Sequence, residues 1–297
     1  MRTTKMVSEG KFALLLLLPT IVLLAGLLLY PFIYSIYLCF VNLNLTKPWL
    51  GTQFVGLANF TTTLMDPEFW SSLKITALFS GFSVAGSLAI GLIAALVLNQ
   101  KLMFRGLFRS LLLIPWAIPL VIVGMIWKLI LHPNYGVLNA LLMQTGIIHK
   151  NIAWLTEPGW SFFMLILSEL WRSFPFVALL YLAALQTIPK DLYEAAKVDG
   201  AGTLHNFRHI TLPFLQPATL VLLVLRTIDA FRAFDLIFAL TKGGPANKTE
   251  IVGLYLYKQG FMFTKFGESA AGSYLVTLLI LLLVFVYVKL FKLKDIQ

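Results

Sequence analysis

The chain has very little cysteine and very little charge. In 297 residues there is one cysteine, Cys39, which excludes an intrachain disulfide and a cysteine-based metal cluster. Charged residues make up 12% of the chain, roughly half the share of a soluble domain, whereas apolar residues make up 59%. The mean hydropathy is +0.85. These values predict an all-α membrane protein that crosses the bilayer several times.

Histidine is also scarce, and its positions favour neither a metal site nor a catalytic site. The four histidines lie in predicted loops, and His205 and His209 are four residues apart without a third ligand nearby. We therefore predict no metal and no catalytic residue. The net charge of +10 does not indicate nucleic-acid binding, because the basic residues flank apolar segments and form no stripe with aromatic residues between them.

Long apolar segments give the predicted architecture. A membrane span needs roughly 20 mostly apolar residues. Six segments meet this condition, and we expect them to form a single transmembrane domain over residues 1–297. The predicted spans are residues 13–40, 74–98, 110–131, 161–186, 215–240 and 268–291.

The lysines and arginines between the spans predict the orientation. Twelve of them fall at the two ends of the chain and in the loops 99–109 and 187–214, against six in the loops 41–73, 132–160 and 241–267. The positive-inside rule then puts both termini and residues 187–214 in the cytoplasm. Four of the six lysines on the opposite side fall in the loop 241–267 and run against this rule.

The loop 187–214, here called the elbow, has an unusual sequence for a connection between spans. Residues 194–217 read "EAAKVDGAGTLHNFRHITLPFLQP". Pro189 can open a helix, and Gly200 can end it in the left-handed conformation. Thr203 can cap a second short helix, which Pro213 is expected to stop. Two short helices at an angle are consistent with an ordinary interfacial loop or with a docking surface for another protein.

The elbow resembles the signature loop of permease subunits of ATP-binding-cassette importers. Every position of the pattern "EAA…DGA…F..I.LP…P" is met, from Glu194 to Pro217. Four further stretches resemble the carbohydrate branch of that family, the maltose and glycerol-phosphate type. They are "FVGLANF" (54–60), "PNYGVLN" (133–139), "IPKDLYEAA" (188–196) and "FDLIFALTKGGP" (234–245).

The resemblance implies a coupling function and a set of partners. In such permeases the elbow docks on a cytosolic ATPase, and the matching residues here are Glu194, Ala195, Ala196, Asp199, Gly200 and Ala201. The expected partners are two ATPase subunits, a second permease that is a different chain, and an extracytoplasmic solute-binding protein that delivers a sugar. ATP and Mg²⁺ belong to the ATPase, because this chain contains no G-x-x-x-x-G-K-[ST] motif. The implied location is the cytoplasmic (inner) membrane of a bacterium or archaeon.

Charges within spans are costly, so those in spans four and five suggest the substrate path. On span four, Glu169, Arg172, Ser173 and Phe176 share one helix face, and on span five Arg226, Asp229, Ala230 and Ala233 repeat the same spacing. An acid, a base and an aromatic ring suit a polyhydroxylated ligand. The alternative is that each acid–base pair, Glu169 with Arg172 and Arg226 with Asp229, is satisfied within itself and that the pairs hold the bundle together.

The predicted function is a permease subunit that imports a small carbohydrate or polyol-glycoside. An anionic substrate of the glycerol-phosphate type stays open, because two arginines lie on the predicted faces. An ion-coupled secondary transporter is the rival from another class, and Pro115, Pro119 and Pro175 could break spans as that class requires.

Overall fold

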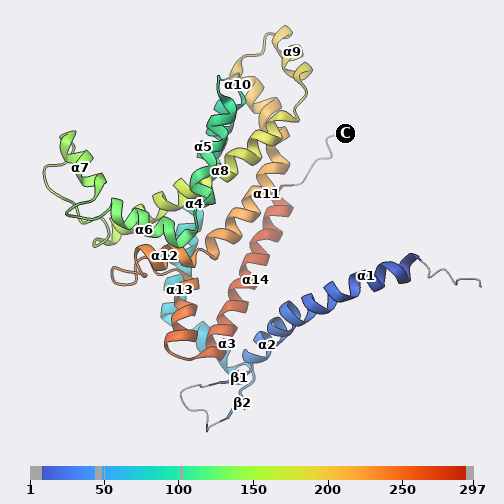
Figure 1. Cartoon of the computed structure of the whole chain (residues 1–297), viewed down its shortest axis with the longest axis vertical. Helices are drawn as coiled ribbons and strands as arrows, with labels where there is room; N and C mark the ends of the chain where they lie inside the picture. Colours follow the sequence, from blue (N-terminus) through green and yellow to red (C-terminus); the bar gives the residue numbers. More distant parts are fainter. Residues whose placement is uncertain (1–8, 44–48, 50, 101–102, 292–297) are drawn as a thin grey trace, which may run out of the picture. The chain divides into compact units, whose positions relative to one another are not determined.

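The computed structural model describes residues 9–43, 49, 51–100 and 103–291, which are mainly helical with one two-stranded ribbon (Figure 1). The chain divides into two compact units. The first contains residues 1–66 and 256–275, and the second contains residues 67–255 and 276–297. Several lysines and arginines of the predicted charge bias lie outside the described residues, namely Arg2, Lys5, Lys47, Lys101, Lys292 and Lys294.

The first unit begins with the first apolar segment. It contains α1 (Glu9–Leu24), η1 (Ala25–Leu29, a π-helix), α2 (Tyr30–Leu38), β1 (Val41–Asn42), β2 (Gln53–Phe54), α3 (Ala58–Met65), η4 (Lys258–Met262) and the start of α14 (Phe266–Leu290). The strands β1 and β2 pair antiparallel, with Val41 opposite Phe54. The stretch 13–38 is long and apolar enough to span a membrane, and its most apolar window has no buried residue.

Asn59 holds the turn between α2 and β1 in place. Its side-chain Nδ2 donates to the carbonyls of Cys39 at 2.9 Å and Val41 at 3.0 Å. A Cβ on Gly267 would lie 2.5 Å from this amide, so only glycine fits there. The motif "FVGLANF" therefore anchors a loop.

The second unit contains the longest helices. They are α4 (Pro67–Asn99), α5 (Arg105–Ala117), α6 (Leu120–Ile130), α7 (Val137–Gln144), α8 (Pro158–Gln186), α9 (Lys190–Val198), α10 (Thr203–Asn206), η3 (Phe207–Thr211, a π-helix), α11 (Leu212–Phe231), α12 (Phe234–Leu240) and most of α13 (Val252–Tyr257), together with the end of α14. Asn139, within α7, bonds to Pro133 before that helix and to Ile152 and Trp154 after it, and so closes the segment that begins with "PNYGVLN".

Helices α4 and α8 pack closely because glycine lies at their interface. A Cβ on Gly91 would meet the Cβ of Val177 at 2.7 Å, and one on Gly86 would meet Leu170 at 2.7 Å. Close approach at small residues is how membrane helices gain packing energy. A buried cluster fills the space among α4, α8 and α11: Ala95, Leu98, Val177, Tyr181, Leu182, Leu185, Ile188, Leu215 and Leu222.

The predicted span 110–131 is not one straight helix. Five helical segments of the described chain are long and apolar enough to span a membrane, and the pair α5 and α6 makes a sixth only as a broken span bent by 94°. Ile118 is extended (φ −76°, ψ 131°) because the proline that follows disfavours the helical conformation at the preceding residue. Pro175, in contrast, lies inside the continuous helix α8.

The predicted span 215–240 also differs in the structure. Helix α11 ends at Phe231, and Ala233 (φ −73°, ψ 48°) is the centre of an inverse γ-turn in which the Phe234 N–H donates to the Arg232 carbonyl at 2.7 Å. Helix α12 follows as a separate short element. On its other side α11 is longer than predicted, because α10, η3 and α11 form one apolar helix over residues 203–231.

We expect Gly91→Ala to destabilise the chain by about 1–3 kcal/mol, because the added methyl group overlaps Val177. Gly81→Ala is the matched control, since it changes the same helix at a position with open space. The unfolding temperature of the purified chain in detergent measures both. Equal temperatures for the two variants would contradict the close approach of α4 and α8.

Candidate substrate path and elbow

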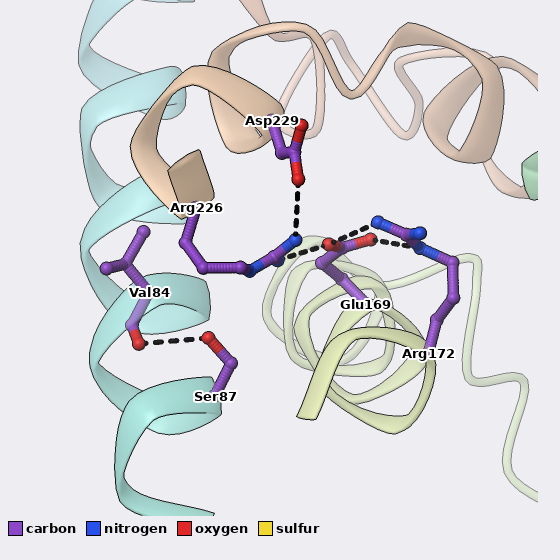
Figure 2. Close-up of polar contacts among 6 residues, drawn as sticks. All are labelled: Val84, Ser87, Glu169, Arg172, Arg226 and Asp229. Atoms are coloured by element: carbon purple, nitrogen blue, oxygen red, sulfur yellow. Dashed lines mark hydrogen bonds and ion pairs between the residues drawn. The ribbon is translucent and has the colours of Figure 1, made fainter. Parts of the chain in front are cut away.

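Four charged side chains from α8 and α11 form a continuous chain of ion pairs, here called the ion chain (Figure 2). Glu169 Oε1 accepts from Arg226 Nη2 at 2.6 Å and from Arg172 Nη2 at 3.2 Å. Glu169 Oε2 also accepts from Arg172 Nε at 3.3 Å. At the other end, Arg226 Nη1 donates to Asp229 Oδ2 at 3.3 Å. The acid–base pair expected within each helix is present. The contact between Glu169 and Arg226 joins the two pairs across the helices.

Burial differs sharply along the ion chain. The side chains of Glu169 and Arg226 are 1% and 2% exposed, Arg172 is 13% exposed, and Asp229 is 53% exposed. Two acids and two bases sum to zero charge. Burying an unpaired charge in an apolar environment costs a large free energy. Glu169 and Arg226 therefore depend on each other for neutralisation. The ends of the ion chain, and above all Asp229, are where another molecule can make contact.

The remaining predicted path residues have different surroundings. Ser173 is 1% exposed, and its hydroxyl has no hydrogen-bond partner within the described part of the chain. Ala230 and Ala233 are buried. Ala233 does not share the helix face of Arg226 and Asp229, because the γ-turn removes it from α11. The expected seven-residue offset therefore fails at that position.

Phe176 is half-buried and stacks on an aromatic ring that the sequence did not single out. Its ring lies 5.5 Å from that of Trp116, with 15° between the planes. Trp116 is near the end of α5, next to Pro115 inside that helix and before the break at Pro119, and is 45% exposed. The position of Trp116 between Pro115 and Pro119 is the only local signal in the sequence that could have identified it as a candidate site residue. Paired aromatic planes of this kind suit the apolar face of a sugar ring.

The elbow has a well-defined turn at Gly200. Helix α9 ends with the Ala201 N–H donating to the Ala196 carbonyl at 2.8 Å and the Gly200 N–H donating to the Lys197 carbonyl at 3.2 Å. This pair of bonds is the Schellman motif, which needs a left-handed residue, and Gly200 supplies it with φ +75°. Glu194, Ala195, Asp199 and Gly200 are exposed, while Ala196 and Ala201 are half-buried.

The elbow has two helical arms, α9 and the helix that begins with α10. The second arm does not stop at Pro213 as predicted. Gly202, not Thr203, is the N-cap, and the helix runs on through Pro213 into α11. The π-turn of η3 permits this, because its wider bonds reach five residues back, as from the Leu212 N–H to the Phe207 carbonyl. The hydroxyls of Tyr193 and Thr211, 2.9 Å apart, link the two arms.

Two cavities of the second unit lie elsewhere. One of about 490 Å³ is lined by residues of α6 and α12 and the loops after them, and one of about 400 Å³ lies among α4, α11 and α14. Neither is lined by the predicted path residues. Within the described residues, no group of three or more His, Cys, Asp or Glu side chains is placed to hold a metal ion.

We expect Glu169→Ala to destabilise the chain by about 3–5 kcal/mol, because it leaves Arg226 buried without its main partner. The double variant Glu169→Ala with Arg226→Ala should recover part of this loss. Glu268→Ala is the control, since it removes an ion pair whose lysine partner, Lys265, is half exposed. Thermal unfolding in detergent compares the three, and a double variant less stable than Glu169→Ala would contradict this account.

Comparison with known proteins agrees with this architecture. The family described as "Binding-protein-dependent transport system inner membrane component" matches residues 87–293. The sulfoquinovosyl glycerol transport system permease protein SmoG of Agrobacterium fabrum is 38% identical over 95% of this chain and 91% of its own. The trehalose/maltose transport system permease protein MalF of Thermococcus litoralis is 38% identical over 95% of this chain and 94% of its own.

A solved structure shares the whole fold. It is the crystal structure of a bacterial ABC transporter involved in the import of the acidic polysaccharide alginate, with a TM-score of 0.81, 27% identity and 96% of each chain covered. The family match covers more than half of the chain, and the relatives align along almost all of it. This chain therefore belongs to the inner membrane components of binding-protein-dependent transport systems and is a permease subunit of such an importer.

Proposed function

We propose that the chain forms half of the translocation path for a small, neutral carbohydrate or polyol-glycoside. The names of its relatives support a carbohydrate, since they refer to sulfoquinovosyl glycerol, to trehalose and maltose, and to alginate. The observation that carries the choice of a neutral substrate is the ion chain. Its charges cancel, and the member most open to a ligand is the acid Asp229, which would repel an anion.

The buried and open parts of the ion chain are assigned different roles. Glu169 and Arg226 are almost fully buried, so they act as the scaffold that fixes the two helices. Arg172 and Asp229 are the groups that offer hydrogen bonds to sugar hydroxyls. Phe176 lies one helical turn beyond Arg172, and its stack with Trp116 supplies the flat apolar surface. Ser173, whose hydroxyl has no partner among the described residues, is 1% exposed and is therefore assigned to the scaffold and not to sugar contact.

The path needs partners. This chain is proposed to supply half of the path, and a second permease of different sequence completes it. Two ATPase subunits hold ATP and Mg²⁺, and an extracytoplasmic solute-binding protein delivers the sugar. The lysine and arginine bias supports an orientation with both termini and the elbow in the cytoplasm, in a bacterial or archaeal inner membrane.

The elbow is proposed to transmit ATPase motion directly to the ion chain. One arm, α9, follows α8, which carries Glu169 and Arg172. The other arm is continuous with α11, which carries Arg226 and Asp229. Because stiff helices lead from the elbow to both halves of the ion chain, a displacement at Gly200 moves the groups that face the substrate. The break between α5 and α6 fits an ion-coupled transporter as well, but family membership favours the ATP-driven mechanism.

Gly200→Trp should abolish sugar-stimulated ATP hydrolysis by the reconstituted importer while the permease still folds, because a large side chain blocks docking at an exposed turn. Gly146→Trp is the matched control. It introduces the same residue at another left-handed glycine (φ +72°) with open space, in a loop expected on the opposite side of the membrane. Undiminished hydrolysis in the Gly200 variant would refute the docking assignment.

Asp229→Ala should reduce uptake at least tenfold without changing the unfolding temperature much, because Asp229 is half exposed and Arg226 keeps its bond to Glu169. Asp235→Ala is the control, since it removes an exposed acid just beyond the γ-turn. Uptake is measured in proteoliposomes with the sugar that the cognate binding protein selects. Normal uptake by the Asp229 variant would remove this residue from the path.

A further inference from the structure

Two arginines at the start of α5 converge on one neutral acceptor. Arg105 and Arg109 are one helical turn apart, and both point their Nη2 groups at the side-chain amide of Gln186. When that amide is assigned with its oxygen toward these donors, the oxygen accepts from Arg109 Nη2 at 2.7 Å and from Arg105 Nη2 at 2.9 Å. Gln186 is the last residue of α8. Neither arginine forms an ion pair within the described residues. We call these three residues the arginine cluster.

The arginine cluster carries an uncompensated positive charge. Both Nε–H groups are buried and have no hydrogen-bond partner in the part of the chain that is described. The N-terminus of α5 adds the positive end of a helix dipole, while the C-terminus of α8 contributes only about half a negative charge. The two guanidinium groups share one neutral amide oxygen, and no anion among the described residues balances their charge. A buried cationic donor without an acceptor is costly, and a phosphate oxygen is the acceptor that a guanidinium fork fits best.

The surroundings of the arginine cluster indicate where the phosphate comes from. Arg105 begins the bent pair α5 and α6, which is apolar enough to form one span, and Gln186 ends the candidate span 158–186. The cluster therefore lies at one end of two candidate spans, the level at which lipid headgroups are expected. Apolar side chains beside it are open to the surroundings. They are Phe104 (67% exposed), Leu107 (57%), Phe108 (49%) and Leu111 (51%).

We propose that the arginine cluster is a binding site for the headgroup of one anionic phospholipid, whose acyl chains lie along the exposed apolar face of α5. Arg105 and Arg109 are only half-buried, so rotation of their side chains brings the free N–H groups to the phosphate. The site is separate from the ion chain and from the exposed turn of the elbow. It adds a specific contact to the general preference of such loops for basic residues.

The test measures lipid retention by the purified full chain in native mass spectrometry, with phosphatidylglycerol as the probe. Arg105→Gln with Arg109→Gln should raise the apparent Kd about 30-fold, the effect of removing two charges near a lipid surface. Lys190→Gln with Arg208→Gln removes two exposed basic residues elsewhere and should leave the Kd unchanged. Leu111→Ser should weaken binding without touching the charges. Size-exclusion profiles and unfolding temperatures confirm that each variant folds.

Three outcomes would overturn the proposal. Equal phosphatidylglycerol retention by the wild-type chain and the double arginine variant would show that the cluster holds no lipid. Full competition by millimolar inorganic phosphate would indicate a soluble anion site. Unchanged lipid binding combined with loss of ATPase subunits from the double arginine variant would indicate that a protein carboxylate is the missing anion.

Discussion

The contact between Glu169 and Arg226 is the constraint on which the second unit depends. Each side chain is almost fully buried, and each comes from a different membrane helix. Separating α8 from α11 would break this short contact and leave each of the two charges with only its weaker partner on its own helix, so the contact favours one register of the helices. The glycine contacts between α4 and α8 and the buried cluster around Val177 add packing to a geometry that the ion pair has already defined. The exposed ends of the ion chain are held in place because its centre cannot move freely.

Long continuous helices alternate with breaks between helices along the second unit. This alternation supports the proposed transmission of motion from the elbow. The helix from Thr203 to Phe231 is unbroken even at Pro213, because a π-turn absorbs the missing N–H group. It ends at the γ-turn centred on Ala233, and the third span breaks at Ile118. This arrangement supports the proposed coupling, because α8 and the helix over residues 203–231 link the elbow to Glu169 and Arg226.

Several stretches that resemble the family organise loops. Asn59 in the first and Asn139 in the second satisfy backbone carbonyls that would otherwise lack donors. In the stretch that ends at Pro245, Thr241 bonds to Thr249, which in turn donates to the Gly244 carbonyl. Short polar side chains at these points replace secondary structure as the partner of the backbone. The motifs therefore identify the fold, and the family match confirms that identification.

The sequence by itself determined the membrane class, the six apolar segments, the left-handed turn at Gly200 and both acid–base pairs within α8 and α11. Each of these depends on residues close together in the chain, where helical spacing and the special conformation of glycine are sufficient evidence. Only the tertiary structure decided that Glu169 joins Arg226, that Trp116 stacks on Phe176 and that α11 ends before Ala233. These features arise from contacts between elements far apart in the sequence, or from a turn that contains neither glycine nor proline. Local periodicity carries no information about them, because the energy of such contacts exists only once the helices have packed.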